Sequence, residues 1–150
     1  MEWNNHYVAR PWLLFDLDLA ASRARYRSGD PAGRRIPGAL EKVASFGVTV
    51  TDLQRWSGGL QLRYFGPRPL VEDNSVRSAA TTLAYARLGY RIGARTSLSL
   101  DVFNLFGKRA SDIDYYYTSR LPGEPAEGVQ DRHFHPVEPR SFRLTLNHRF

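Results

Sequence analysis

The sequence predicts an all-β protein, an antiparallel up-and-down meander of about seven strands. Polar and apolar residues alternate with period two through most of the 150 residues, as they do in strands whose two faces meet different surroundings. The connections between these segments alternate between short and long, which places all short turns at one end of the sheet. No stretch approaches the roughly 18 consecutive apolar residues of a membrane-spanning helix.

The first three predicted strands cover residues 2–8, 12–26 and 41–50. The first is partial. In the second, the odd positions through residue 21 are apolar, whereas Asp16 and Asp18 occupy even positions. In the third, the even positions from residue 44 are apolar and the odd ones are small or polar. Each of these strands therefore has one apolar face and one polar face.

The remaining predicted strands are 55–65, 80–92, a segment that starts at Thr96, and 141–150. The last one is the most regular, and it alternates up to its terminal residue, Phe150. Its apolar face is occupied by Phe142, Leu144, Leu146, His148 and Phe150. A register slip of one residue would turn Arg143 toward that face, which in lipid costs roughly 2 to 4 kcal/mol near the midplane.

The connections indicate how the sheet is oriented. Short links lie at 9–11, 51–54 and 93–95, whereas long links rich in Gly, Pro and charge lie at 27–40, 66–79 and within 107–139. The segment GDPAG, residues 29–33, is predicted to be a turn. Short turns on one side and long loops on the other are the plan of an outer-membrane β-barrel.

A soluble protein with a half-buried antiparallel sheet also alternates, so a soluble or small-barrel binding module of the lipocalin type is the alternative. The apolar faces are about 9 to 11 residues long, which suits a bilayer. The opposite face is too polar to pack as a core. Trp56 and Tyr64 are separated on one face by about 20 Å along the bilayer normal, which fits two interfacial girdles. The predicted aromatic girdle is Trp12, Trp56, Tyr64 and Tyr90.

The composition excludes several function classes. The formal charge is +6, but the arginines are spread along the chain, so nucleic acid is not an expected partner. Partners rich in phosphate or carboxylate, including lipid head groups, suit the guanidinium groups. Cysteine is absent, which removes disulfides and thiolate metal sites. The first residues do not have the pattern of a secretory signal.

Three stretches resemble the C-terminal barrel portion of TonB-dependent outer-membrane receptors. They are LSLDVFNLFGKRASDIDYYY at 98–117, HFHPVEPRSFRLTLNHRF at 133–150, and RYFGPRPLVEDNSVRS at 63–78. DVFNLFGKR is similar to the penultimate-strand signature of these receptors, and EPRSFRLTLNHRF is similar to their last strand. The resemblance implies a fragment of a 22-stranded transmembrane β-barrel in the cell outer membrane.

The resemblance also implies a domain organisation and partners. Residues 1–150 are expected to be the C-terminal portion of such a barrel, without the signal peptide, TonB box, plug and earlier strands. The intact receptor would contact the plug and the TonB complex and import a large scarce solute, such as an iron siderophore. The barrel would also contact outer-membrane lipid and lipopolysaccharide. The barrel assembly machinery would recognise Phe142, Leu144, Leu146 and Phe150. The chain alone is not expected to transport.

The remaining candidate residues lie near the predicted external end. Tyr115, Tyr116, Tyr117, His133 and His135 are candidates for a ligand mouth, although the tyrosines also suit an external girdle and strand pairing. His133 and His135 share one side of a strand, but no third ligand has metal-site spacing. No cofactor is expected. No paired carboxylates or nucleophile support catalysis, so the prediction is that the protein is not an enzyme.

Overall fold

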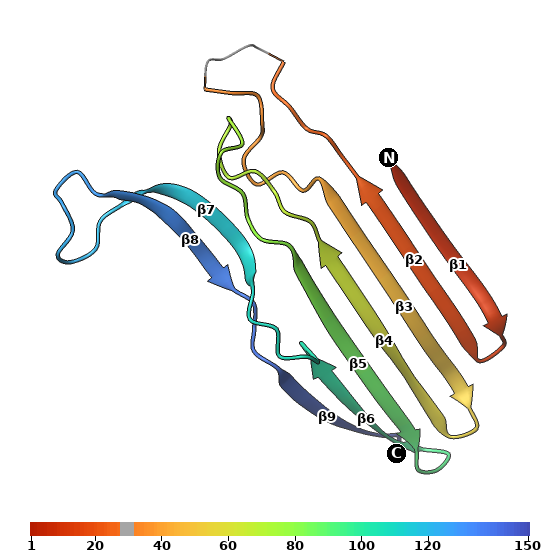
Figure 1. Cartoon of the computed structure of the whole chain (residues 1–150). Coiled ribbons are helices and arrows are strands. Elements are labelled where there is room, and N and C mark those ends of the chain that lie inside the picture. The colour runs from red at the N-terminus through yellow and green to blue at the C-terminus, as the bar shows by residue number, and fades with distance from the viewer. Residues whose placement is uncertain (28–31) are drawn as a thin grey trace.

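The computed structural model describes residues 1–27 and 32–150, and these residues form strands and no helix. No helix in this part of the chain could therefore span a membrane. The nine strands follow one another as shown in Figure 1. Their bounds are β1 Glu2–Arg10, β2 Leu13–Ala21, β3 Lys42–Leu53, β4 Trp56–Phe65, β5 Thr81–Arg91, β6 Thr96–Phe103, β7 Ser111–Ser119, β8 Val129–Pro136 and β9 Ser141–His148.

Seven of the strands form one antiparallel sheet in the order β1-β2-β3-β4-β5-β6-β9. These are the seven strands that the alternation predicts, so the all-β meander is confirmed. Figure 1 shows the sheet as one curved layer, with the β1–β2, β3–β4 and β5–β6 turns at the same end. The long connections lie at the other end, as the loop lengths indicate.

Two strand boundaries differ from the prediction by more than two residues, and the last strand ends at His148 rather than at Phe150. The second strand ends at Ala21 rather than at residue 26, because the chain leaves the ladder and Arg25 instead bridges to Arg35 within the long loop. The third strand continues past Val50 to Leu53, with a register shift before its turn. The predicted turn at 29–33 falls largely on residues 28–31, which lie outside the described residues.

The segment within 107–139 is more ordered than a long loop. It contains a second, two-stranded sheet, the hairpin of β7 and β8. The sequence pattern indicates this segment only as a long link and does not assign the two strands, because alternation in 111–119 is carried by polar and aromatic residues rather than aliphatic ones. In Figure 1 the hairpin projects beside the loop end of the main sheet.

The strand register gathers the apolar residues on one face of the sheet. Leu17 pairs with Phe46, and Phe46 pairs in turn with Leu62 across β4. At the other edge, Leu100 pairs with Leu144. Because paired residues in a ladder point to the same face, an apolar surface runs without interruption from β2 to β9.

This apolar face does not form a sealed core. Among the described residues, only Leu70 and Ala84 are buried hydrophobic side chains, and Leu144 keeps 67% of its surface exposed. The two edge strands, β1 and β9, lie at opposite ends of the strand order, and the described residues show no pairing between them. The sheet is therefore open, unlike the closed small barrel of the lipocalin alternative.

The opposite face is polar and carries charged contacts. Asp101 is 6% exposed, accepts a hydrogen bond from the Tyr85 hydroxyl, and lies 3.5 Å from Nε of Arg87. The Arg143 guanidinium lies 5.1 Å from the centre of the Phe103 ring. The polar and charged groups on this face make hydrogen bonds, ion pairs and a cation–π contact with one another. This composition indicates that the face meets water or another polar surface.

Candidate functional site at the loop end of the sheet

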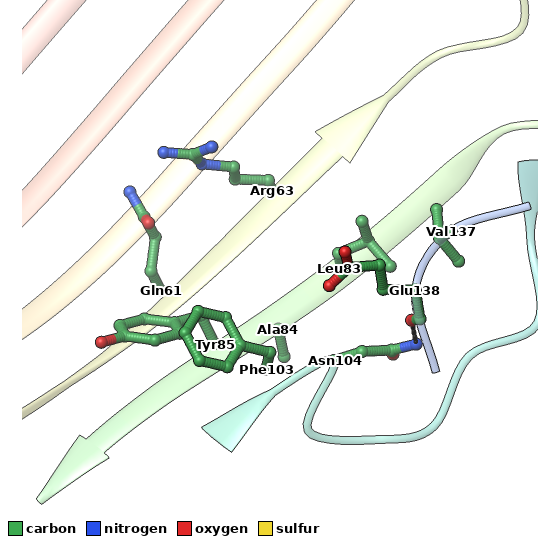
Figure 2. Close-up of a pocket in the computed structure, with 9 residues that line it drawn as sticks. All are labelled: Gln61, Arg63, Leu83, Ala84, Tyr85, Phe103, Asn104, Val137 and Glu138. Carbon is green, nitrogen blue, oxygen red and sulfur yellow. Dashed lines mark hydrogen bonds between the residues drawn. The ribbon is translucent and has the colours of Figure 1, made fainter. Parts of the chain in front are cut away.

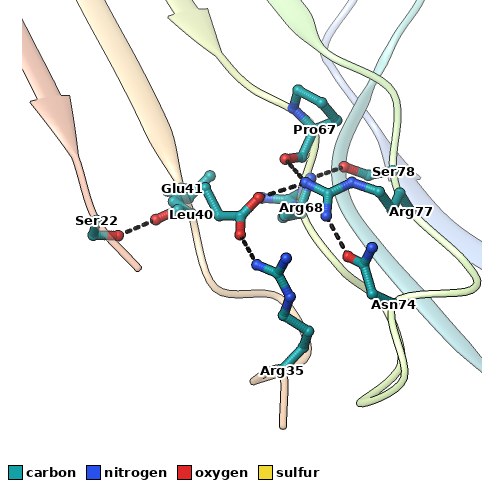
Figure 3. Close-up of polar contacts among 9 residues, drawn as sticks. All are labelled: Ser22, Arg35, Leu40, Glu41, Pro67, Arg68, Asn74, Arg77 and Ser78. Atoms are coloured by element: carbon teal, nitrogen blue, oxygen red, sulfur yellow. Dashed lines mark hydrogen bonds and ion pairs between the residues drawn. The ribbon is translucent and has the colours of Figure 1, made fainter. Parts of the chain in front are cut away.

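Two long loops are clamped together at the start of β3. Nη2 of Arg77 donates a hydrogen bond to Oε2 of Glu41 at 2.6 Å and another to the carbonyl of Pro67 at 2.7 Å. Arg35 donates to the other carboxylate oxygen, and Arg77 also donates to the Asn74 side chain. Figure 3 shows the two arginines approaching the carboxylate from different loops. The Arg77 hydrogen bond holds the pKa of Glu41 below its ordinary value, against the opposing effect of partial burial.

The second of these loops also holds the β7–β8 hairpin. Nη2 of Arg68 donates to the carbonyl of Asp112 at 2.7 Å and lies 3.6 Å from Oδ2 of Asp114. Asp114 is 5% exposed. Nearby, the Thr81 hydroxyl donates to the carbonyl of Ser111 at 3.3 Å. The hairpin is therefore fixed to the main sheet through charge-assisted hydrogen bonds rather than through an apolar core.

A cavity of about 410 Å³ lies where the loops meet the hairpin. Its walls come from the β2–β3 loop, the β4–β5 loop, β7 and β8. The lining includes charged, apolar and phenolic groups. Among them are Arg68, Leu70, Glu72, Tyr115, Tyr116 and Tyr117. The structure thus brings the three predicted tyrosines together with loop residues that are distant in sequence.

The predicted histidines lie beside two of these tyrosines. His133 stacks on Tyr117 with ring centres 4.0 Å apart, and His135 meets the edge of Tyr115 at 6.3 Å. Tyr116 pairs with Arg132 and points to the other face of the hairpin. Within residues 1–27 and 32–150, no three potential ligand side chains gather as a metal site would require. The histidines are instead arranged as aromatic partners.

A second cavity, of about 400 Å³, lies on the polar face below the hairpin. Figure 2 shows Gln61 and Arg63 of β4 and Tyr85 of β5 on the same side of the sheet as Phe103. The Asn104 side chain donates to the carbonyl of Glu138 at 2.9 Å and so closes one wall. Its lining is largely apolar and includes two charged side chains, those of Arg63 and Glu138.

The predicted girdle residues lie at both ends of the sheet. Trp56 and Tyr90 are cross-strand partners with ring centres 4.6 Å apart, next to the short turns. Trp12 lies in the β1–β2 turn at that same end. Tyr64 pairs with Ala44 toward the loop end. This placement is the geometry that two girdles require, and their contact with lipid stays a prediction.

The residues predicted as an assembly signal lie on the edge strand β9. Phe142, Leu144 and Leu146 pair with apolar residues of β6 and are exposed on the apolar face. Phe150 follows the strand and meets the edge of the His148 ring at 4.9 Å. Recognition of these residues by an assembly machinery stays a prediction.

The sequence interpretation missed the polar contacts that build the loop end. Glu41, Arg68 and Arg77 come from loops that only the folded sheet brings together. Their residue types gave no signal, because arginines occur throughout the chain. Asp114 of β7, which contacts Arg68, is buried. Its alternation with Ile113 and Tyr115 could have revealed β7.

Comparisons with known proteins agree with this architecture. No protein-family model matches the chain. Over 98 residues, 63% of its length, the chain is 35% identical to the catecholate siderophore receptor Fiu of Escherichia coli K12. The crystal structure of Fiu in an open form superposes on 98% of the chain with a TM-score of 0.69 and 21% identity. The ferric yersiniabactin receptor FyuA of Yersinia pestis superposes on 99% with a TM-score of 0.73 and 19% identity.

The chain matches a segment of the β-barrel of a TonB-dependent receptor. The siderophore receptor PiuA of Acinetobacter baumannii has the same arrangement, with a TM-score of 0.71, 15% identity and 98% of this chain covered. The segment is a small part of each relative. It spans 11% of the curated Fiu sequence and 20%, 23% and 21% of the solved Fiu, FyuA and PiuA chains. These relatives are receptors and transporters, not enzymes.

Proposed function

We propose that this chain is the C-terminal barrel segment of an outer-membrane receptor that imports a large scarce solute by coupling to TonB. The observation that carries the proposal is the uninterrupted apolar face of the seven-stranded sheet, which is exposed in the chain itself. An exposed apolar surface of this extent needs a covering partner, and a hydrocarbon layer suits its shape.

The loop end is the proposed site of solute recognition. The cavity between the loops and the hairpin combines tyrosine rings with Arg68 and Glu72. Tyr115, Tyr117, His133 and His135 share one face of the hairpin and would form its outer rim. The name of Fiu, a catecholate siderophore receptor, supports an iron chelate as the class of solute. In the intact receptor, a plug would occupy the polar face and TonB would act on that plug.

The apolar face and its rims are the proposed contacts with the membrane. Trp12, Trp56 and Tyr90 would lie at the periplasmic interface, and Tyr64 at the external one, next to lipopolysaccharide. Phe142, Leu144, Leu146 and Phe150 would be recognised by the barrel assembly machinery during insertion. These assignments place the short turns in the periplasm.

Lipid contact can be tested by quenching. The chain is reconstituted in vesicles whose acyl chains are brominated either near the head group or near the bilayer centre, and tryptophan fluorescence is recorded. Shallow bromines should quench more strongly than deep ones, because Trp12 and Trp56 would lie at the interface. A folded chain whose emission is insensitive to both lipids would refute the proposal. In that case the apolar face is covered by something other than lipid.

Solute recognition requires the complete receptor in its host. Replacing both Tyr115 and Tyr117 with alanine should reduce binding of a ferric catecholate by cells at least several-fold, since each ring contributes about 1 kcal/mol or more. The matched control is Tyr7→Ala, which removes an exposed tyrosine from β1. Equal binding by the hairpin variant, at equal receptor abundance, would exclude the hairpin from the recognition site.

A further inference from the structure

One carboxylate at the loop end of the sheet has fewer hydrogen-bond partners than its burial requires. The Asp114 side chain of β7 is 3% exposed and lines the cavity of about 410 Å³ between the loops and the hairpin. Its Oδ1 atom has no hydrogen-bond partner among residues 1–27 and 32–150. A buried carboxylate is normally hydrogen-bonded, because its removal from water is costly. A donor from outside the described residues would complete this site.

The arginine beside this carboxylate does not supply the missing donor. Nη2 of Arg68 lies 3.6 Å from Oδ2 of Asp114, which is longer than a hydrogen bond. The same nitrogen donates to the backbone carbonyl of Asp112 at 2.7 Å. Rotation about the last side-chain torsion, which is broad in aspartate, would turn a carboxylate oxygen toward the cavity. The Asp114 carboxylate can therefore accept a hydrogen bond from a group inside the cavity.

The loop walls of the cavity are joined by backbone hydrogen bonds. The backbone N–H of Gly38 donates to the carbonyl of Pro69 at 2.8 Å. The backbone N–H of Arg35 donates to the carbonyl of Glu72 at 2.9 Å. Between these contacts, Leu70 is only 4% exposed. The β2–β3 and β4–β5 loops thus form one packed wall, and the cavity is a built feature of the fold.

The charges and rings around the cavity favour a cation. The lining has two carboxylates, those of Glu72 and Asp114, and one guanidinium group, that of Arg68. The side chains of Tyr115 and Tyr117 also line it, and these residues are 47% and 51% exposed. The faces of such rings attract cations. A protonated amine combines a positive charge with N–H donors, so it suits both the net charge of the lining and the unpartnered oxygen.

We propose that the loop-end cavity binds an ammonium group carried by the solute, with the Asp114 carboxylate as its hydrogen-bond acceptor. The inference rests on the proposed function, because that function makes this cavity part of the solute site. It narrows the class of solute from iron chelates in general to chelates that bear a free amine. The amine would enter the cavity, while the iron-binding groups would stay at the rim formed by Tyr115 and Tyr117.

The test compares two probes on cells that produce the complete receptor in its outer membrane. The first probe is the ferric complex of a catecholate chelator that carries a primary aminopropyl arm. The second is the same complex with the amine acetylated, which removes the positive charge. The unaltered receptor should bind the free amine roughly tenfold more tightly, because a hydrogen bond between charged groups is stronger than one between neutral groups.

Three variants locate the origin of this preference. Asp114→Asn should abolish the preference, because the amide keeps the shape of the side chain and removes its charge. Asp112→Asn is the matched control, since it removes the same charge two residues away, does not line the cavity and keeps the backbone carbonyl that Arg68 contacts. Its preference should equal that of the unaltered receptor. Glu72→Gln should lower the preference a few-fold without altering the hairpin.

The outcomes separate this inference from the function proposed above. Equal affinities of the unaltered receptor for the two probes would overturn the inference alone, because an ordinary water molecule would then suffice as the partner of Asp114. A preference that persists in Asp114→Asn, or that is lost equally in Asp112→Asn, would also overturn it. If Asp114→Asn does not reach the membrane, an unchanged preference in Glu72→Gln overturns the inference. Binding of neither probe, at normal receptor abundance, would refute the iron-chelate class of solute and this inference together.

Discussion

Replacing Leu144 with arginine tests which solvent the apolar face meets. Leu144 lies three residues from the start of β9 and four from its end. At about 3.3 Å per residue and about 40° tilt, it lies about 8 Å below one end of the strand and about 10 Å above the other, close to the midplane. An arginine at that depth costs about 2 to 4 kcal/mol in lipid. In water the same change should cost about 0.5 kcal/mol or less, because the leucine is already 67% exposed.

The neighbouring residue supplies a control at the same depth. Thr145 pairs with Ser99 and lies on the polar face, so Thr145→Arg should change stability by about 1 kcal/mol or less. The assay is urea unfolding of the chain in short-chain phosphatidylcholine vesicles, followed by tryptophan fluorescence. Equal costs for the two arginines would contradict the assignment of faces. A large cost at Leu144 in the absence of lipid would show that the apolar face packs against protein instead.

Three further predictions follow from the strand contacts and the loop end. Gly58→Ala should destabilise the sheet by about 1 to 3 kcal/mol, because the added Cβ would lie 2.6 Å from the Arg87 carbonyl oxygen. Gly47→Ala is the control and should be tolerated, because its Cβ would lie 3.5 Å from the nearest atom, in the Asp16 side chain. Urea unfolding compares the stabilities of the two variants. The Glu41 carboxylate has a lowered pKa in the folded chain, so its stabilisation is complete above the pKa of the unfolded chain and is lost as the pH falls through the folded value. Protease cleavage of the 66–79 loop should therefore accelerate in acid, and Glu41→Gln should remove that pH dependence. Arg68→Ala should speed hydrogen exchange in β7 and β8 while leaving β2–β4 unchanged, and equal protection of the hairpin in both proteins would show that Arg68 does not hold it.

The main sheet could be predicted because the alternation of polar and apolar residues lies within each strand segment. Alternation with period two assigns each residue of a strand to a face without any knowledge of its neighbours. Leu17, Phe46 and Leu62 were each assigned to the apolar face from their own strands, and the register then placed them side by side. The lengths of the connections were enough to predict which end of the sheet carries the short turns and which carries the long loops.

The hairpin and the loop clamp were not predictable in the same way. In 111–119 the alternating residues are tyrosines and acids, so neither face is clearly apolar. The partner of β7 is β8, which begins after the nine residues 120–128. A period-two pattern does not specify which strand pairs with which. Glu41 and Arg77 are 36 residues apart in sequence, and their ion pair exists only because β3, β4 and β5 bring the two loops to one end.

The sequence by itself therefore determined the fold class, the seven strands of the main sheet, the face of each residue and the two ends of the sheet. Hydrophobic patterning is a property of each segment, and it does not depend on which strands become its neighbours in the sheet. Only the tertiary structure decided which polar side chains meet: those of the Glu41 clamp, and Arg68 with the hairpin. Ion pairs and hydrogen bonds act over a few ångströms between groups far apart in the chain, so their partners are set by the folded geometry and not by the local pattern.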